Sequence, residues 1–445
     1  MTVNLQEWLE TAVEAAFSAG DVIVKVGADS SNIEKDIKTK SNDGDFVTIA
    51  DRSAQRVIFS VLTGKFPQLK IVGEEVNCEG CSPESSFIPC SSNIEERTSS
   101  MSTLVSDCSL PHTKLRLSPR SLCSKSVCLA REALQECDED SPVEQTMSCH
   151  KVHHVPCSVD LPIEDCIVFV DPLDGTFNFV HGCLFGVGVS IGLTYKGQAI
   201  AGVMFYPFFS KKLLHKYNFP KNLHIYMDNG SFLHPFHAQI TELKKQNVPI
   251  DLFYGAQYGD YCNCNLTEYR QTLWASRLSQ LSETKPFSEH YFQIQNMSPD
   301  RLNPLSEWID KQTSETHIKI RSKDGFQTFY GALCKFREFL LGLGGCFGVI
   351  YINGFLKPWD ICAFMGIAHS LNIDVYTKEP KPLTLSKSSG SAYVLKKGYL
   401  FKPDRKGNIP FFITTSYDST HSSQLATISL DIANSLESLQ TDKNA

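Results

Sequence analysis

Residues 167–182 read IVFVDPLDGTFNFVHG, and this stretch decides the fold that we expect. Its apolar start, residues 167–170, is typical of a buried strand. The strand ends in two acids, Asp171 and Asp174, and Gly175 then indicates a tight turn. Carboxylates clustered at a strand end repel each other unless a cation lies between them. The stretch therefore predicts a cation-binding turn at the end of a rigid strand.

Two amphipathic helices are predicted before this strand. Apolar residues recur at helical spacing over residues 5–17, which predicts a first helix that ends near Gly20. A second helix is expected to follow Asp51 and to be stopped by Gly64 and Pro67. Both helices have one apolar face, so we expect them to pack on a sheet.

Further strands are predicted on both sides of the opening stretch. Residues 69–72 form a short apolar strand that ends at Glu74. Residues 187–193 and 199–204 are expected to pair, with the turn between them at residues 196–197. Helices and strands thus alternate, which indicates an α/β or α+β protein.

Composition excludes several classes of function. The chain has 445 residues, of which 42% are hydrophobic, and a formal net charge of -7. The sequence contains no block of basic residues of the kind that indicates nucleic-acid binding. It also contains no apolar run long enough to predict a membrane span. The N-terminus does not resemble a signal peptide, so we expect a cytoplasmic protein whose 16 cysteines are reduced thiols.

Changes of composition along the chain suggest two halves and an insertion. We expect residues 1–215 to form an N-terminal α+β half that binds the metal, and residues 216–432 to form a C-terminal α/β half that completes the site. Residues 77–163 are rich in Ser and Cys and are expected to be a mostly disordered insertion. The polar tail 433–445 is expected to fray.

Four acids occupy similar places in the sequence, at the end of a strand or the start of a helix. Glu74, Asp171 and Asp174 each end or follow a strand, and Asp360 opens an apolar helix at residues 361–368. Oxygen-only ligands of this kind favour a hard cation such as Mg²⁺. Taken singly, each acid is as well explained as a helix cap or a solvated loop residue. Together they predict metal-assisted transfer of a phosphoryl group to water.

The chain resembles the inositol monophosphatase superfamily of Mg²⁺-dependent, lithium-sensitive phosphatases. The motifs that carry the resemblance stand in the family's order: VTIAD (47–51), IVGEE (71–75), DPLDGTFNFVHG (171–182) and KPWDICA (357–363). The resemblance implies an α/β (α+β) fold, a layered αβαβα sandwich of the inositol monophosphatase and fructose-1,6-bisphosphatase type. It also implies a phosphoric monoester hydrolase, in a family whose members are often dimers.

The resemblance further implies a role for each site residue. Family members hold Mg²⁺, two or three ions, through positions that match Glu74, Asp171, Leu173 (by its carbonyl), Asp174 and Asp360. Asp51 and Thr176 are expected to orient and deprotonate the attacking water. The backbone N–H groups of Gly175 and Thr176 are expected to bind the phosphate. His181 is a candidate substrate contact, with a packed side chain as the alternative.

Two branches of the family compete for the substrate. The 3'(2'),5'-bisphosphate nucleotidases, which convert adenosine 3',5'-bisphosphate to AMP, resemble the chain at ADRSAQ (50–55), KFPQLKIVGEE (65–75), YKGQAIAGV (195–203) and the Lys-x-Trp-Asp-x-Cys-Ala motif (357–363). DGTFNFVHG (174–182) is instead typical of inositol monophosphatases. We favour the nucleotidase, with inositol monophosphatase or inositol polyphosphate 1-phosphatase as the alternative.

Departures from the family concern the substrate pocket. The nucleotidases carry a Gly-Gly-Ala-Gly-x-Lys element, which we expect to align with residues 317–329, where no Gly-rich turn stands. Paired glycines that usually follow the Trp-Asp helix are replaced at residues 369–373. Residues 211–330 therefore diverge, and a catalytically degenerate protein that binds a phosphorylated metabolite is a further alternative.

Overall fold

The computed structural model describes a compact unit within Met1–Val76 and Asp140–Ala445. The described residues are 1–28, 38–39, 46–75, 152–155, 157, 159–180, 184–218, 234–273, 291–295, 319–321, 331–343, 346–380, 393–402 and 409–415. Most of the predicted insertion and the predicted frayed tail lie outside these residues. Among the described helices, none combines the length and apolar character needed to cross a membrane.

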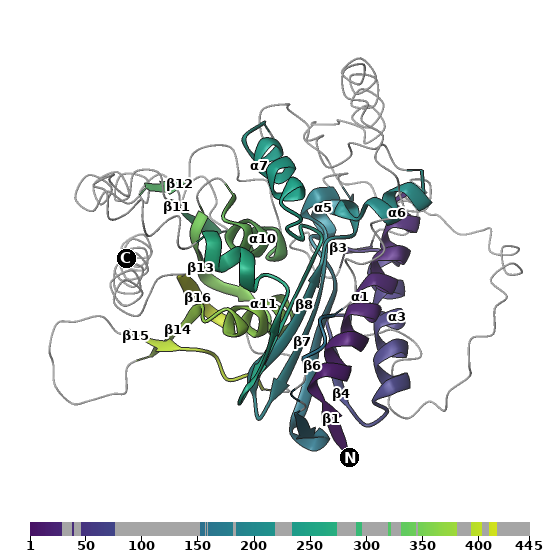
Figure 1. Cartoon of the computed structure of the whole chain (residues 1–445), viewed down its shortest axis with the longest axis vertical. Helices are drawn as coiled ribbons and strands as arrows, with labels where there is room; N and C mark the ends of the chain where they lie inside the picture. The colour runs from purple at the N-terminus through teal and green to yellow at the C-terminus, as the bar shows by residue number, and fades with distance from the viewer. Residues whose placement is uncertain are drawn as a thin grey trace, which may run out of the picture. The chain divides into compact units, whose positions relative to one another are not determined.

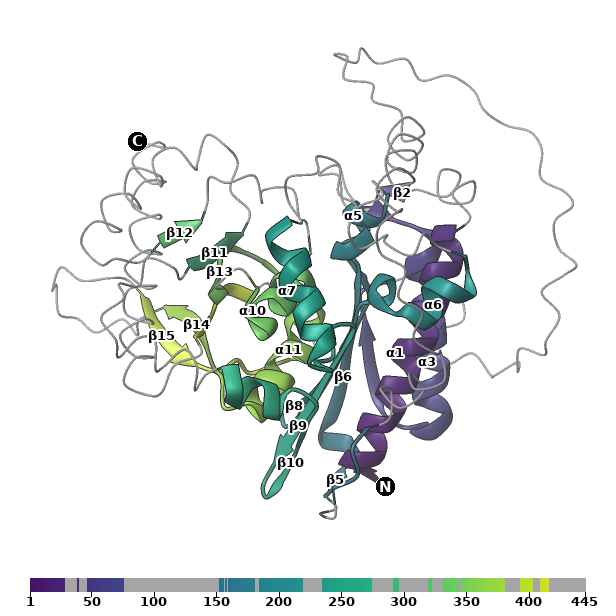
Figure 2. The ribbon, with the colours of Figure 1, turned by 45° about the horizontal axis from the view of Figure 1, so that its top comes forward.

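The first sheet has six strands in the order β10-β9-β8-β7-β6-β4. Neighbouring strands are antiparallel except for the parallel pair of β4 and β6. The hairpin of β9 and β10 forms one edge (Figure 2). The bounds are β4 Lys70–Gly73, β6 Cys166–Asp174, β7 Gly188–Tyr195, β8 Gln198–Phe205, β9 Leu252–Tyr258 and β10 Tyr261–Cys264.

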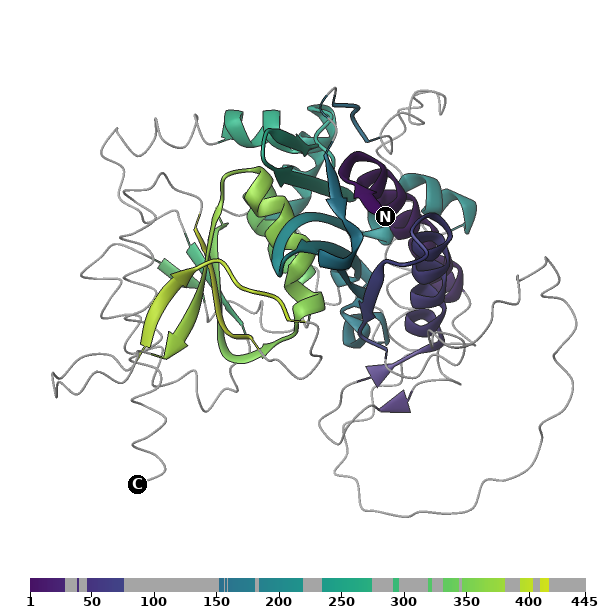
Figure 3. The ribbon, with the colours of Figure 1, turned by 90° about the horizontal axis from the view of Figure 1, so that it is seen from below.

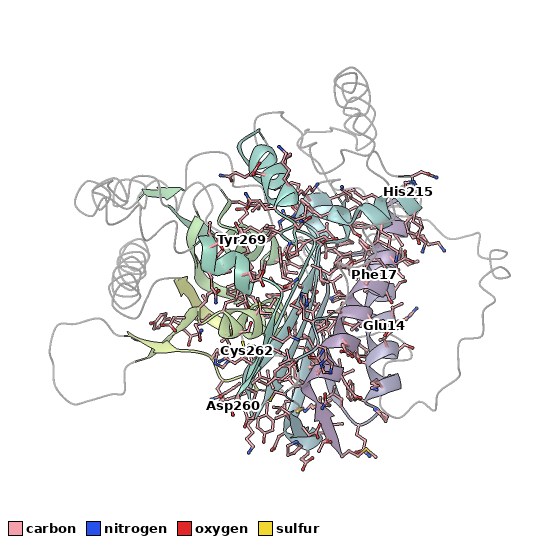
Figure 4. The ribbon with its side chains drawn as sticks, in the orientation of Figure 1. Glu14, Phe17, His215, Asp260, Cys262 and Tyr269 are labelled. Carbon is pink, nitrogen blue, oxygen red and sulfur yellow. The ribbon has the colours of Figure 1, made fainter. Side chains whose placement is uncertain are left out.

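Helices α1 (Leu5–Ala28) and α3 (Ile49–Lys65) cover one face of this sheet (Figure 1). The expectation that the first helix ends near Gly20 is wrong, because α1 continues for two further turns. A Cβ at Gly20 would overlap the ring of Phe205. The glycine therefore permits close packing of helix on strand and does not end the helix. Phe17, one turn earlier, packs on the same ring with centroids 5.5 Å apart (Figure 4).

The second helix begins where a threonine caps it. The Thr48 side chain accepts from the Ala50 N–H, and the Asp51 carboxylate accepts from the Thr48 N–H at 2.8 Å. This reciprocal pattern satisfies backbone groups that a helix start leaves without partners. The helix buries Ala54, Ile58 and Leu62, as the sequence predicted, and ends at Lys65.

Helices α10 (Leu333–Leu341) and α11 (Pro358–Ser370) cover the opposite face of the first sheet. The approach of α11 is close: a Cβ at Gly202 on β8 would overlap the backbone of Ala363. Both helices also contact the second sheet, so they form a layer between the two sheets (Figure 3).

The second sheet also has six strands, in the order β12-β11-β13-β16-β14-β15. Strand β11 is parallel to its two neighbours, and the remaining pairs are antiparallel. The bounds are β11 Tyr291–Gln295, β12 Lys319–Arg321, β13 Cys346–Leu356, β14 Asp374–Pro380, β15 Tyr393–Lys397 and β16 Ile409–Thr415. The described elements thus form the layers α, β, α and β, in agreement with the expected α/β sandwich.

Short elements complete the unit. They are β1 Thr2–Asn4, β2 Lys38–Thr39, β3 Phe46–Val47, β5 Asp160–Pro162, η3 Ile163–Asp165, α5 Thr176–Val180, η4 Leu184–Gly186, η5 Pro207–Phe209, α6 Lys211–Lys216 and α7 His234–Lys245. The end of the predicted insertion is ordered, since β5 pairs with β1. Strands β9 and β10 extend the first sheet beyond residue 215, so the predicted boundary does not coincide with the end of that sheet. The division into two halves stays a prediction.

Candidate active site

An irregularity in β6 determines how its two acids point. Asp171 pairs with Ser190 and Asp174 pairs with Gly188, so β6 has one more residue than β7 over this interval. Residues three apart on a regular strand face opposite sides, and an extra residue changes this alternation. The Leu173 N–H donates to the Asp171 carboxylate at 3.0 Å and fixes the turn. The bulge therefore brings both acids to one region.

The Asp174 carboxylate is held by the start of α10. The N–H groups of Ala332 and Leu333 donate to its two oxygens at 2.9 and 2.8 Å. Gly331 just before them has a φ of 119°, and a Cβ there would lie 2.8 Å from Asp174 Oδ2 and 3.2 Å from the Cα of Gly175. Glycine at position 331 thus permits the close approach of α10 to the turn after β6.

Asp51 and Thr176 lie together, 125 positions apart in sequence. The Thr176 hydroxyl lies 2.8 Å from Asp51 Oδ1 and 3.2 Å from the Leu173 carbonyl oxygen, either of which it can donate to. Asp51 is fully buried, and its other oxygen accepts from the Thr48 N–H. Burial raises the pKa of Asp51 to about 6. The pair that the sequence predicted is therefore in contact, and its acid is poised near neutral pH.

Glu74 lies directly after β4 and beside β6. Its N–H donates to the Val170 carbonyl at 3.0 Å, which continues the pairing of the two strands by one residue. The charge of its carboxyl group acts on the Asp171 carboxyl group and raises the pKa of Asp171 beyond the effect of burial. The acids that end two neighbouring parallel strands thus meet at one edge of the sheet.

Asp360 reaches the same region from α11. It lies in the first turn of that helix, where one oxygen accepts from the Lys357 N–H at 2.6 Å. Trp359, the residue before Asp360, is hydrogen-bonded to the first sheet, because the Ser190 hydroxyl donates to its carbonyl at 3.0 Å. Ser190 is the strand partner of Asp171, so this bond connects the two acids through the backbone.

The four acids act on one another electrostatically. Burial raises the pKa of Asp171 well above its usual range, and the charges of the other three acids raise it further. Burial also raises the pKa of Asp174 to about 6, and the pKa of Asp360 is raised well above its usual range by burial and then by the charges of Asp174 and Glu74. Carboxylates that oppose each other's ionisation are stabilised by a cation among them.

The donor set fits a hard divalent cation. The acids that act on one another are all carboxylates, the Leu173 carbonyl lies next to the Thr176 hydroxyl, and oxygen ligands suit Mg²⁺. Within the described ranges, however, no group of three or more His, Cys, Asp and Glu is arranged so that it could hold a metal ion as it stands. Asp174 directs both oxygens to α10, and Asp360 directs one to Lys357. To bind an ion, these two carboxylates would have to use the lone pairs that their hydrogen bonds leave, or their side chains would have to rotate.

The predicted phosphate contacts lie at the start of α5. Gly175 has a φ of 84°, and a Cβ there would lie 2.6 Å from the Gly186 carbonyl oxygen. Thr176 begins α5, which has only five residues. The N–H contacts of both residues to phosphate stay a prediction, and His181 lies outside the described residues.

A second candidate for the Gly-Gly-Ala-Gly-x-Lys element lies next to the site. The Gly-Gly-Ala-Gly-x-Lys element was aligned with residues 317–329, of which only Lys319–Arg321 is described, as the edge strand β12. Residues 331–335, which read GALCK, instead contact Asp174 and keep the Gly, Ala and Lys of the element at matching spacing. Allowing two substitutions in the six-residue pattern, at positions 330 and 333, would have found them.

Lys335 belongs to that element and is a buried cation. Its side chain is 8% exposed, and its ammonium group donates to the Gly331 carbonyl at 3.3 Å. Its charge lowers the pKa of Asp174 in opposition to burial. Within the part of the chain that the structure describes, the site therefore combines a group of acids with the buried positive charge of Lys335.

Comparison with known proteins gives a consistent result. The model of the inositol monophosphatase family matches residues 4–97 and 120–256, slightly more than half of the chain. Human 3'(2'),5'-bisphosphate nucleotidase 1 is 30% identical over 211 residues, 46% of this chain and 48% of the relative. An inositol monophosphatase of Mesembryanthemum crystallinum is 27% identical over 205 residues, 46% of this chain and 45% of the relative. The chain thus spans about half the length of the curated relatives that it matches.

Among solved structures, an IMPase of Thermotoga maritima aligns over 97% of this chain and 98% of its own, with 14% identity and a TM-score of 0.45. The family match includes Asp51, Glu74, Asp171 and Asp174 and ends before Lys335 and Asp360. From the match over more than half of its length, we conclude that the chain belongs to the inositol monophosphatase family.

Proposed function

We propose that the chain is a Mg²⁺-dependent phosphomonoesterase that hydrolyses adenosine 3',5'-bisphosphate to AMP. The observation that carries this proposal is the position of the Asp51–Thr176 pair beside Glu74 and three buried acids, Asp171, Asp174 and Asp360, whose pKa values are raised by burial and by neighbouring negative charge. A general base and a cation site are the two parts that metal-assisted hydrolysis of a phosphate ester requires.

The residues divide the work as follows. Glu74, Asp171, Asp174, Asp360 and the Leu173 carbonyl would hold Mg²⁺, which polarises phosphate oxygens and lowers the pKa of nearby water. Thr176 would hold the attacking water with its hydroxyl. Asp51 would receive the proton through that hydroxyl, since its pKa of about 6 is close to the working pH.

Lys335 supports a substrate with a second anionic group. A phosphate beyond the one cleaved would meet a surplus of negative charge from the acids. The buried ammonium group of Lys335, whose charge already acts on Asp174, would offset that charge. The curated relatives named as bisphosphate nucleotidases are consistent with such a substrate.

Inositol monophosphate is the second candidate. The NFVHG segment (178–182) is typical of that branch, and an inositol monophosphatase of Solanum lycopersicum is 60% identical over 38 residues, 8% of this chain and 14% of the relative. A monophosphate would make no use of Lys335, which separates the two candidates by experiment.

The first experiment measures phosphate released from a panel of substrates. The full chain is assayed with Mg²⁺, with and without Li⁺, on adenosine 3',5'-bisphosphate, inositol 1-phosphate, inositol 1,4-bisphosphate and fructose 1,6-bisphosphate. We expect Asp171→Asn to lower the rate at least about 100-fold. Glu164→Gln, an exposed acid at the entry to β6, is the matched control and should keep the wild-type rate. Equal rates for wild type and Asp171→Asn would refute the proposal.

The second experiment tests the substrate. Lys335→Met removes the charge and keeps much of the side-chain length. We expect it to raise KM for adenosine 3',5'-bisphosphate by about 10-fold, because one charge-assisted interaction with the second phosphate is lost. The KM for inositol 1-phosphate should change much less. Equal changes for both substrates would favour a structural role of Lys335 and leave the nucleotidase assignment without its support.

A further inference from the structure

Gln55 forms a pair of hydrogen bonds with the backbone that carries Glu74. Its side chain is 1% exposed and lies on the buried face of α3. Its Oε1 accepts from the Glu75 N–H at 2.9 Å, and its Nε2 donates to the Glu75 carbonyl oxygen at 2.8 Å. A primary amide thus makes the two bonds that a neighbouring strand would make.

The position of this pair matters because β4 is an edge strand. Strand β6 lies on one side of β4, and among the described strands of the first sheet none lies on its far side. Glu74 bonds to the β6 side through its N–H, which donates to the Val170 carbonyl, and Glu75 bonds to the α3 side through Gln55. The backbone at Glu74 is therefore fixed from both sides, and the charge of its carboxyl group acts on Asp171.

Gly73 provides the space for the amide. A Cβ there would overlap Gln55 Oε1 and would lie 2.6 Å from its Cδ and 3.0 Å from the ring of Phe59. Gly73 is absent from the residues with positive φ, so its backbone conformation does not require glycine. Close approach of the Gln55 amide is the physical reason for a glycine at this position.

We propose that Gln55 is a positioning residue that orients Glu74 for the Mg²⁺ site, an inference that rests on the proposed function. Gln55 follows Asp51 by one turn of α3, so one helix holds both the predicted base and the backbone of a predicted ligand. Groups that orient metal ligands typically change metal affinity or activity 10- to 100-fold when they are lost. Gln55 reaches no reacting atom and acts only through Glu74.

The experiment measures ion binding in the absence of substrate. Mg²⁺ is titrated into the full chain by calorimetry, and thermal unfolding is recorded in EDTA for the same samples. We expect Gln55→Met to weaken Mg²⁺ binding 10- to 100-fold. Gly73→Ala should give the same defect by displacing the amide, which keeps the test independent of any one variant. Leu62→Ala, on the buried face of α3 two turns beyond Gln55, is the control for general destabilisation.

The control separates positioning from stability. Leu62→Ala should lower the unfolding temperature at least as much as Gln55→Met and yet leave the Mg²⁺ dissociation constant within about twofold of wild type. Wild-type Mg²⁺ affinity in Gln55→Met would overturn the inference, and so would an equal loss of affinity in Leu62→Ala.

Phosphate release, measured separately, distinguishes this inference from the proposed function. A wild type that binds Mg²⁺ without turnover, together with weak binding by Gln55→Met, would refute the proposed reaction and support the role of Gln55. Normal turnover by wild type with unchanged ion binding by Gln55→Met would refute the role of Gln55 alone.

Discussion

Gly331→Ala is expected to disrupt the contact between α10 and the acidic turn. The added Cβ would lie 2.8 Å from Asp174 Oδ2 and 3.2 Å from the Cα of Gly175, and the backbone φ of 119° is one that alanine rarely adopts. Either Asp174 or the start of α10 must shift. Both hydrogen bonds from Ala332 and Leu333 to the carboxylate depend on that contact.

The magnitude follows from these two effects. Strain at a glycine-only conformation costs about 1–3 kcal/mol. Loss of one hydrogen bond to the charged Asp174 carboxylate costs about 1.5–3 kcal/mol. The free energy of unfolding should therefore fall by about 2.5–6 kcal/mol, a large part of the roughly 5–15 kcal/mol that stabilises a typical protein.

Urea unfolding of the metal-free chain at fixed pH measures this loss. Gly64→Ala is the matched control: Gly64 lies inside α3, no atom lies within 4 Å of its added Cβ, and its φ is not positive. This control should gain about 0.5–1 kcal/mol, because alanine favours helix over glycine. A Gly331→Ala protein that loses less than about 1 kcal/mol would refute the close approach of α10 and the reasoning on Asp174.

Three other changes test separate parts of the molecule. Thr176→Val should lower kcat by about 100- to 10,000-fold while Thr176→Ser stays near wild type, and an unchanged rate of phosphate release for Thr176→Val would exclude the relay. Burial raises the pKa of Asp51 from 3.8 to about 6. Protonated Asp51 therefore contributes about 3 kcal/mol to the free energy of unfolding, and this contribution is complete below pH 3.8 and lost as the pH rises through 6. Asp51→Asn should flatten this part of the stability profile in urea titrations without metal, and parallel profiles would contradict the raised pKa. Asn263→Ala removes the hydrogen bonds that the Asn263 amide donates to the His153 carbonyl at 2.6 Å and to Gln6 Oε1 at 3.2 Å. The free energy of unfolding in urea should therefore fall, and a fall below about 1 kcal/mol would show that these bonds contribute little.

Elements with strong local signals were predicted well. The turn at residues 196–197 joins β7 to β8 as expected, with φ values of 50° and 78° that suit a two-residue hairpin. The helix after Asp360 is apolar on nearly every side, and it is indeed buried between the two sheets. In both cases the information lies within a few neighbouring residues, so no distant contact was needed to interpret it.

Elements that depend on distant contacts were predicted poorly. Gly20 looked like a helix end, yet α1 continues past it, and the glycine instead leaves space for the ring of Phe205, far along the chain. The GALCK segment (331–335) matches the family element only when substitutions are allowed, and its contact with Asp174 marks it as part of the site. Gln55 was part of a matched motif without a stated role, since its partner Glu75 is 20 positions away.

The sequence by itself determined which elements and acidic residues this protein has: a buried strand that ends in two acids, the helices around it, and the matching acids at Glu74 and Asp360. It also indicated the family that uses these residues. Only the tertiary structure decided how the parts meet. The bulge in β6 turns Asp171 and Asp174 to one region, and α3 brings Asp51 to Thr176 and Gln55 to the backbone beside Glu74. The reason is physical: local propensity and spacing specify which element forms, whereas the direction of a side chain depends on register and on packing between segments that are far apart in the chain.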